Sequence, residues 1–213
     1  MAELKDLSVE AFADVTASDA PAPGGGSVAA VAGSLAAALA EMVANLTIGK
    51  KGYEEQEAEM KRLAAEGAAI RETLIADIRR DSDSFNAFMD AMALPKDTEE
   101  QQEARRAKMQ ECLKAAAEVP LSAAETACKI FPIAEAVVKS GNKNAVTDGL
   151  VSALLARRAV LGALLNVRIN LASIRDEAFV ADMRARVTEL ERTAQESEKK
   201  VLQLSDLISD IQF

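Results

Sequence analysis

One long predicted helix, within residues 141–176, constrains the fold of this chain more than any other stretch. It reads GNKNAVTDGLVSALLARRAVLGALLNVRINLASIRD, and its pattern predicts a helix that begins near Asn144. At about 100° per residue, Asp148 and Asn166 are separated by five whole turns and point in the same direction. Other small or uncharged polar residues share that direction: Asn144, Ser152, Gly162, Asn170 and Ser173. A buried polar group must find a partner, so we expect something polar to meet this face.

A second polar stripe follows the glycine-rich segment SDAPAPGGGS, residues 18–27. Residues 25–48 predict a helix rich in alanine and glycine, which lets neighbouring backbones approach closely. Its polar residues recur at spacings of 7, 7 and 4 on one side: Ser27, Ser34, Glu41 and Asn45. We predict that the two stripes face one shared cleft. The alternative is that they hydrogen-bond to each other across a helical core.

The rest of the chain also reads as helix, because no run alternates with the period of two that marks a strand. We predict an all-α fold, a single-domain bundle of long, partly kinked helices over residues 1–213. Further helices are expected over residues 4–15, 54–92, 99–140 and 177–210. Pro120 and Pro132 should bend or break the helix over 99–140. The last helix is expected to pack on the bundle or to form a dimer contact.

Charge and composition argue against several partners and compartments. With a formal net charge of −9, the chain lacks the basic footprint that nucleic acids and acidic membranes require, so neither is an expected partner. Cys112 and Cys128 have no histidine to complete a metal site and are typical of thiols in a reducing compartment. The first residues, MAELKDLSVEAF, carry acids where a signal peptide carries basic residues. We therefore expect a cytoplasmic protein.

Two loops offer candidate binding groups. The glycines Gly24, Gly25 and Gly26 can present backbone amides closely to a ligand, and Ser27 follows as a donor or as an ordinary helix cap. The segment GKKGY, residues 49–53, contains two lysines and the only tyrosine: Lys50, Lys51 and Tyr53. The alternative for this second loop is a solvated connection.

Several catalytic signatures are absent from the sequence. Without histidine, Ser–His and Cys–His pairs are impossible. The glycine run lacks the Gly-Lys-Ser/Thr of a P-loop, and no strand precedes it as in a dinucleotide fingerprint. The carboxylates show no metal-ligand spacing, so no metal site is predicted. The remaining groups suit a planar, polar heterocycle with anionic ends, for which Asp148 would be a general base or a counter-charge.

Four segments resemble the cyclodeaminase/cyclohydrolase family of folate enzymes. They are residues 21–53, 81–85 (DSDSF), 94–101 (LPKDTEEQ) and 141–171, in collinear order over nearly the whole chain. The family includes the C-terminal domain of formiminotransferase-cyclodeaminase and free-standing methenyltetrahydrofolate cyclohydrolases. The resemblance implies an all-helical homodimer that binds one-carbon derivatives of tetrahydrofolate. The folate is then the substrate, and no further cofactor is expected.

The resemblance implies one of two reactions. A cyclohydrolase adds water to 5,10-methenyltetrahydrofolate and opens the ring to 10-formyltetrahydrofolate, whereas a cyclodeaminase closes 5-formiminotetrahydrofolate and expels ammonia. The transferase domain that supplies the formimino compound has no counterpart in these residues, which favours the cyclohydrolase. The rival hypothesis is a non-catalytic helical binding or scaffold protein whose polar stripes only fix helix register.

The resemblance also suggests roles for the candidate residues. Asp148 would stabilise the cationic N–C–N unit and take a proton from water, unless it only favours the helix dipole. Lys50 would assist proton transfer or, with Lys51, meet the glutamate tail. Asp81 would bind the guanidine-like edge of the pterin. The other candidate binding residues are the three glycines, Ser27, Asn45, Tyr53, Asn144, Asn166 and Asn170.

Overall fold

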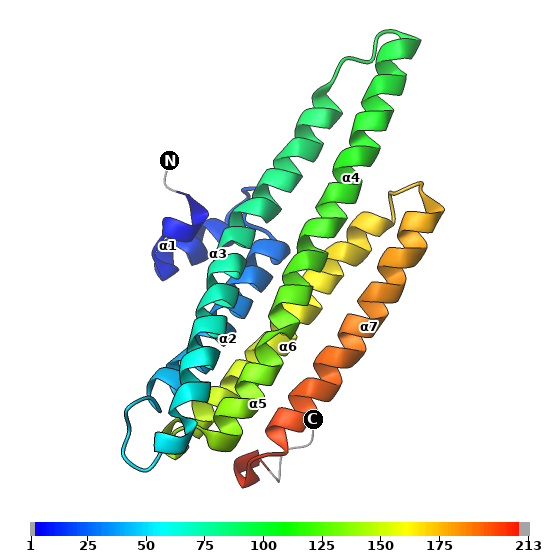
Figure 1. The fold of residues 1–213 in the computed structure, drawn as a ribbon. Coiled ribbons are helices and arrows are strands. Elements are labelled where there is room, and N and C mark those ends of the chain that lie inside the picture. Colours follow the sequence, from blue (N-terminus) through cyan, green and yellow to red (C-terminus); the bar gives the residue numbers. More distant parts are fainter. Residues whose placement is uncertain (1–2, 209–213) are drawn as a thin grey trace.

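The computed structural model describes residues 3–208, and this range is all-α, as predicted, with no strand. Short turns and 3₁₀ segments separate the α-helices, which are α1 (Val9–Thr16), α2 (Gly25–Asn45), α3 (Glu57–Ala93), α4 (Glu99–Cys128), α5 (Ile130–Ser140), α6 (Val146–Leu171) and α7 (Glu177–Leu202). In Figure 1, α3 and α4 form a long helical hairpin that reaches beyond the other helices at one end. The outermost parts of the predicted range, residues 1–2 and 209–213, lie outside the described residues.

Local capping explains where some helices begin and end. The helix predicted over 4–15 is divided, because Ser8 accepts a hydrogen bond from the Ala11 N–H at 3.1 Å and starts α1 there. The helix predicted over 144–176 ends at Leu171, and Asp176 caps α7 by accepting from the Phe179 N–H. The helix predicted over 177–210 ends at Leu202 and packs against α6.

The break predicted within residues 99–140 falls at Lys129 and not at Pro120. Pro120 stays inside α4 although it has no N–H for the carbonyl of Ala116, four residues earlier. Asn170 of α6 supplies the missing donor, because its Nδ2 lies 2.8 Å from that carbonyl oxygen. Pro132 is the third residue of α5, where a missing N–H leaves no helical hydrogen bond unmade.

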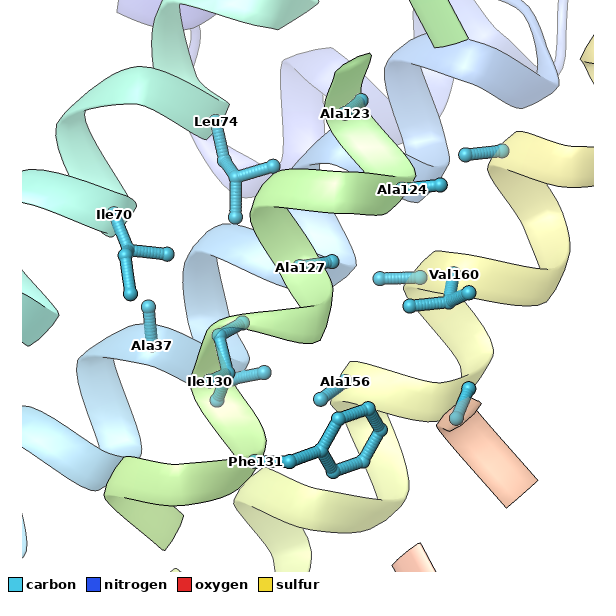
Figure 2. Close-up of a cluster of buried hydrophobic side chains, with 14 of the residues drawn as sticks. Ala37, Ile70, Leu74, Ala123, Ala124, Ala127, Ile130, Phe131, Ala156 and Val160 are labelled. Atoms are coloured by element: carbon cyan, nitrogen blue, oxygen red, sulfur yellow. The ribbon is translucent and has the colours of Figure 1, made fainter. Parts of the chain in front are cut away.

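Small residues hold the centre of the bundle together. α2 packs against both α3 and α6, and a methyl group on Gly33 would lie 3.0 Å from Leu74 and 3.2 Å from Ala159. Ser152 of α6 donates to the Ala36 carbonyl of α2 at 2.7 Å, so the two backbones are also tied by a buried hydrogen bond. Figure 2 shows the adjoining core, where alanines of α4 such as Ala124 lie near larger side chains of the neighbouring helices.

The outer side of α2 and α6 carries exposed apolar side chains. We call this surface the α2–α6 face, and its exposed members are Val28, Leu35 and Met42 of α2, Leu46 directly after it, and Val151, Leu165 and Ile169 of α6. By length and composition, α2 and residues Lys143–Leu171 could each cross a membrane, but 56% and 50% of their most apolar windows are buried in the bundle. Core helices commonly have this composition, so the exposed face is the part that packing within the chain does not explain.

Candidate functional site

A partly buried carboxylate, that of Asp81, marks the end of the bundle where α2 begins, which we call the glycine end. Ser27 is fully buried, and its hydroxyl donates to Oδ2 of Asp81, on α3, at 2.8 Å. A methyl group on Gly26 would lie only 2.1 Å from Oδ1 of Asp81. Gly26 therefore makes room for the carboxylate to approach the first turn of α2. Ser27 is a partner of Asp81, and no side chain caps the helix.

A cleft of about 360 Å³ opens beside this carboxylate. The glycine segment, α3, α4 and α6 all contribute to its wall: Pro21, Ala22, Gly24, Gly25, Gly26, Asp81, Ser82, Ser84, Phe85, Phe88, Leu113, Ala116, Asn166, Ile169 and Asn170. Two phenylalanines thus lie on the same wall as one carboxylate and two side-chain amides. An apolar surface with a few fixed polar groups is the usual composition of a small-molecule site.

The electrostatics of this end are dominated by burial. Burial raises the pKa of Asp81 above the usual aspartate value, and hydrogen bonds from Ser27 oppose that shift. Burial also raises the pKa of Asp77, one turn earlier, which is only 1% exposed. Nη1 of Arg80 lies 2.6 Å from Oδ1 of Asp77, while Oδ2 has no hydrogen-bond partner among the described residues. A cationic or hydrogen-bonding ligand in the cleft would favour the ionised form of Asp81.

Two of the four predicted asparagines, Asn166 and Asn170, reach the cleft, but their amide nitrogens are already engaged. Asn166 donates to the carbonyl of Gly162 at 2.9 Å, and a methyl group on Gly25 would lie 3.2 Å from the same nitrogen. Asn170 donates to the carbonyls of Ala116 and Asn166. Part of the role of these asparagines is therefore structural.

The other predicted residues gather where α2 ends and α6 begins, which we call the lysine end. Gly49 and Gly52 have φ values of +69° and +89° and turn the chain sharply. The Tyr53 hydroxyl accepts from the Lys143 N–H at 3.1 Å, and Lys50 Nζ lies 5.9 Å from the centre of the tyrosine ring. Lys51, Asn45 and Asn144 are exposed.

Asp148 also belongs to the lysine end. It lies in the first turn of α6 and is half-buried, and no hydrogen bond or ion pair to its carboxylate occurs within residues 3–208. By contrast, the backbone around it is tightly held, since the Asn142 N–H donates to Thr47 Oγ1 at 2.8 Å and the Asn142 side chain donates to the Leu46 carbonyl. Asp148 is thus a carboxylate on a rigid support with no side-chain partner in its own described chain.

The prediction of one cleft shared by the two polar stripes is wrong. The stripe of α2 faces α3, where Ser27 meets Asp81 and Glu41 forms an ion pair with Arg71 at 2.8 Å. The stripe of α6 faces α2 and α4, whose backbone carbonyls accept from Ser152 and Asn170. Eighteen residues separate Asp148 from Asn166 along α6, which is about 27 Å at 1.5 Å per residue. The candidate residues therefore form two separate groups within one chain.

The sequence prediction missed the apolar part of the cleft. Phe85 and Phe88 continue the row of apolar residues along one side of α3, a pattern that is typical of an ordinary hydrophobic core. However, α2 begins only beside Asp81, so it does not cover these phenylalanines, and Phe85 is 37% exposed. The available signal was that the glycine run, residues 24–26, packs beside Asp81 and leaves the following apolar residues of α3 uncovered. Using this signal required knowing that α2 and α3 are neighbours.

Comparison with known proteins agrees with the resemblance seen in the sequence. The family model described as formiminotransferase-cyclodeaminase matches residues 8–189. A methenyltetrahydrofolate cyclohydrolase from Methylorubrum extorquens is 43% identical over 86% of this chain and 87% of its own length. The formimidoyltransferase-cyclodeaminase of Sus scrofa is 38% identical over 90% of this chain, which corresponds to only 35% of that longer protein.

A solved structure shows the same fold. The crystal structure of formiminotetrahydrofolate cyclodeaminase from Thermotoga maritima superposes with a TM-score of 0.87 at 34% identity, covering 97% of this chain and all of that one. Sequence and architecture agree along nearly the whole length. The chain therefore belongs to the formiminotransferase-cyclodeaminase family.

Proposed function

We propose that the protein is a methenyltetrahydrofolate cyclohydrolase. The observation that carries this proposal is the 43% identity to a protein of that name, matched over most of both lengths. The glycine-end cleft is chemically suitable for a reduced folate, because Phe85 and Phe88 offer apolar surface to a ring system and Asp81 offers an acceptor. The N–H groups of a pterin's guanidine-like edge would donate to the Asp81 carboxylate.

The reaction requires one proton acceptor and one proton donor. Water adds to the carbon between N5 and N10 of the methenyl compound and loses a proton. The hydroxyl group that results loses its own proton as the bond from that carbon to N5 breaks and N5 takes up a proton, so 10-formyltetrahydrofolate and one net proton are left. Asp148 is our choice for the group that balances the cationic N–C–N unit and accepts the proton from water, with Lys50 assisting proton transfer.

A formiminotetrahydrofolate cyclodeaminase is the second candidate, supported by the name of the Thermotoga maritima structure. Both reactions pass through a tetrahedral carbon between the same two nitrogens, so one site suits either. The ultraviolet absorbance of methenyltetrahydrofolate, followed with and without the protein, tests the first reaction. Ammonia release from 5-formiminotetrahydrofolate tests the second. Loss of absorbance above the spontaneous rate supports the cyclohydrolase, and acceleration of neither reaction contradicts both activities.

We also propose that the protein is a homodimer formed through the α2–α6 face. Glu41 is the only charged residue of α2, and its ion pair with Arg71 turns it towards α3. The outer side of α2 thus presents uncharged, largely apolar side chains, which is typical of a surface that another protein covers. A twofold dimer uses the same patch on both copies, so one apolar face is sufficient. Sedimentation equilibrium tests this proposal, because a monomer at micromolar concentration contradicts it.

The acidic charge and the free thiols bear on the cellular compartment and the partners of the protein. We propose a cytoplasmic protein without nucleic-acid or membrane partners, in keeping with its acidic charge and with free thiols at Cys112 and Cys128. Burial raises the pKa of the Cys128 thiol to about 12. We propose turnover without a metal or other cofactor, since the family resemblance makes the folate itself the substrate. Dialysis against a chelator is then expected to leave turnover unchanged.

A further inference from the structure

The two groups of candidate residues lie at opposite ends of one helix pair. α2 and α6 run antiparallel, since Gly25 lies against Asn166, Ala36 bonds to Ser152, and Leu46 bonds to Asn142. The glycine end therefore contains the start of α2 and the last turns of α6. The lysine end contains the last turn of α2 and the first turns of α6. About 27 Å separates the two ends, so the Asp81 cleft and Asp148 of one chain cannot act on the same atom.

Both groups nevertheless border the same surface. On a helical projection, Asp148 and Asn166 point in one direction, which is about 60° from that of Val151 and Ile169 and about 100° from that of Leu165. These apolar residues belong to the α2–α6 face. The face thus has the cleft at one end and the unpartnered Asp148 carboxylate at the other.

A twofold axis that lies in the interface and runs across these helices exchanges the two ends of the face. In an isologous interface with this axis, whatever lies at one end of the first copy is brought towards the opposite end of the second. We propose that each active site is built by two copies of the chain, with the Gly24–Gly26 and Asp81 cleft from one and Asp148 and Lys50 of the partner subunit. This inference rests on the proposed function and on the α2–α6 face being the dimer surface. The apolar face then joins two half-sites as well as two chains.

A second copy suits this surface better than a lipid bilayer does. Arg158 is exposed on α6 and lies in the same line as Val151 and Leu165 on the helical projection. Inserting the face into a membrane would bury this guanidinium and the Asp148 carboxylate in hydrocarbon, which is unfavourable for both charges. At an interface with another copy, both groups can meet polar atoms.

Mixed dimers of two inactive variants test the proposal. Asp148→Asn and Asp81→Asn are produced separately, and then together with two different affinity tags so that the heterodimer can be isolated. We expect each homodimer to lose at least about 100-fold in turnover. In the heterodimer both substitutions fall in one site and the other site is intact, so turnover should return to about half that of the wild-type dimer.

A site that lies within a single chain would give a different result for the heterodimer. If each site lies within a single chain, both chains of the heterodimer carry a broken site and turnover stays as low as in the homodimers, which overturns the proposal. Both folate substrates are assayed, so a wild-type protein that only deaminates still gives a readable result. A wild-type protein inactive on both substrates overturns the proposed function instead. Flotation of the wild-type chain with phospholipid vesicles, without dimer formation, would also overturn the shared site.

A second pair of variants protects the test against a folding defect at Asp81. Phe85→Ala alters the cleft at a partly exposed side chain and is combined with Asp148→Asn in the same way. Circular dichroism and sedimentation of each homodimer confirm that the chains fold and associate. We expect this heterodimer also to exceed both of its parent homodimers in turnover, and equality with the weaker parent would contradict the shared site.

Discussion

The glycine end and the lysine end hold their carboxylates in opposite ways. Asp81 is partly buried against the first turn of α2, takes a hydrogen bond from Ser27, and has a pKa that this burial raises. Asp148 is also partly buried but has no partner within the described chain. The backbone at both ends is firmly fixed by neighbouring helices. The difference therefore lies in whether the carboxylate already has a hydrogen-bond partner within its own chain.

This difference separates positioning from reaction. A carboxylate held in one place by Ser27 and Gly26 suits recognition of a fixed ring edge, because its geometry does not depend on the ligand. A carboxylate without a partner remains available to accept a proton or to balance a cation. The following variants test this division of roles.

The largest effect is expected for Asp148→Asn. An amide keeps the shape of the side chain but removes the charge and the proton acceptor, so turnover should fall by about 100-fold or more. The melting temperature should hardly change, because no described contact is lost. Asp14→Asn, at an exposed aspartate of α1, is the matched control and should leave turnover unchanged. Turnover by Asp148→Asn within a few fold of wild type would remove Asp148 from the mechanism.

Gly26→Ala tests the glycine end. The added methyl group would lie 2.1 Å from Oδ1 of Asp81, so the carboxylate must move and the hydrogen bond from Ser27 is lost. We expect a loss of about 1–3 kcal/mol in the free energy of unfolding, together with weaker substrate binding. Gly24→Ala is a close control, since nothing lies within 4 Å of its added methyl group. Urea denaturation and KM measurements compare the two, and equal effects would contradict a specific role for Gly26.

The sequence predicts the individual helices better than the glycine-end cleft that they form together. Helical periodicity was sufficient for the all-α fold, and it correctly gave Asp148 and Asn166 a common direction. It could not say which helix faces each stripe, so it offers Ser27 as a ligand donor or a helix cap, whereas the hydroxyl donates to Asp81 on α3. Asn170 illustrates the same limit, because its donor completes α4 at Pro120, a contact between residues 54 positions apart. Local rules describe helices, whereas the cleft depends on how they are assembled.

The pH dependence of stability gives a smaller test of the partly buried Asp81 carboxylate. The pKa of Asp81 is raised above 3.8 in the folded protein, so the folded state binds its proton more tightly than the unfolded chain. Between the two pKa values, the free energy of unfolding therefore falls as pH rises, and above the folded value this contribution is constant. Asp81→Asn should remove the contribution of Asp81 to this fall in the free energy of unfolding. Asp77 makes a contribution of the same sign, and because the Asp81 charge is a minor cause of its raised pKa, Asp81→Asn removes that small part as well.

Urea denaturation at a series of pH values from about 3 to 7 measures this effect. Asp83→Asn is the control, because Asp83 is exposed and forms only a surface ion pair with Arg79 at 3.3 Å. A wild-type stability that does not fall with pH in this range, relative to Asp81→Asn, would contradict the raised pKa.

The smallest effect is expected from the two adjacent lysines of the lysine end. Lys50 is half-buried beside the Tyr53 ring, whereas Lys51 is exposed. If Lys50 acts next to Asp148, Lys50→Ala should lower turnover by roughly fivefold, which corresponds to about 1 kcal/mol for a partly screened charge. Lys51→Ala should change turnover by less than about twofold and chiefly weaken binding of substrates with longer glutamate tails at low salt. Turnover and KM are measured for both variants at two ionic strengths. A larger loss of turnover in Lys51→Ala would reverse the assignment, and because both residues carry the same charge, position alone would then have to explain it.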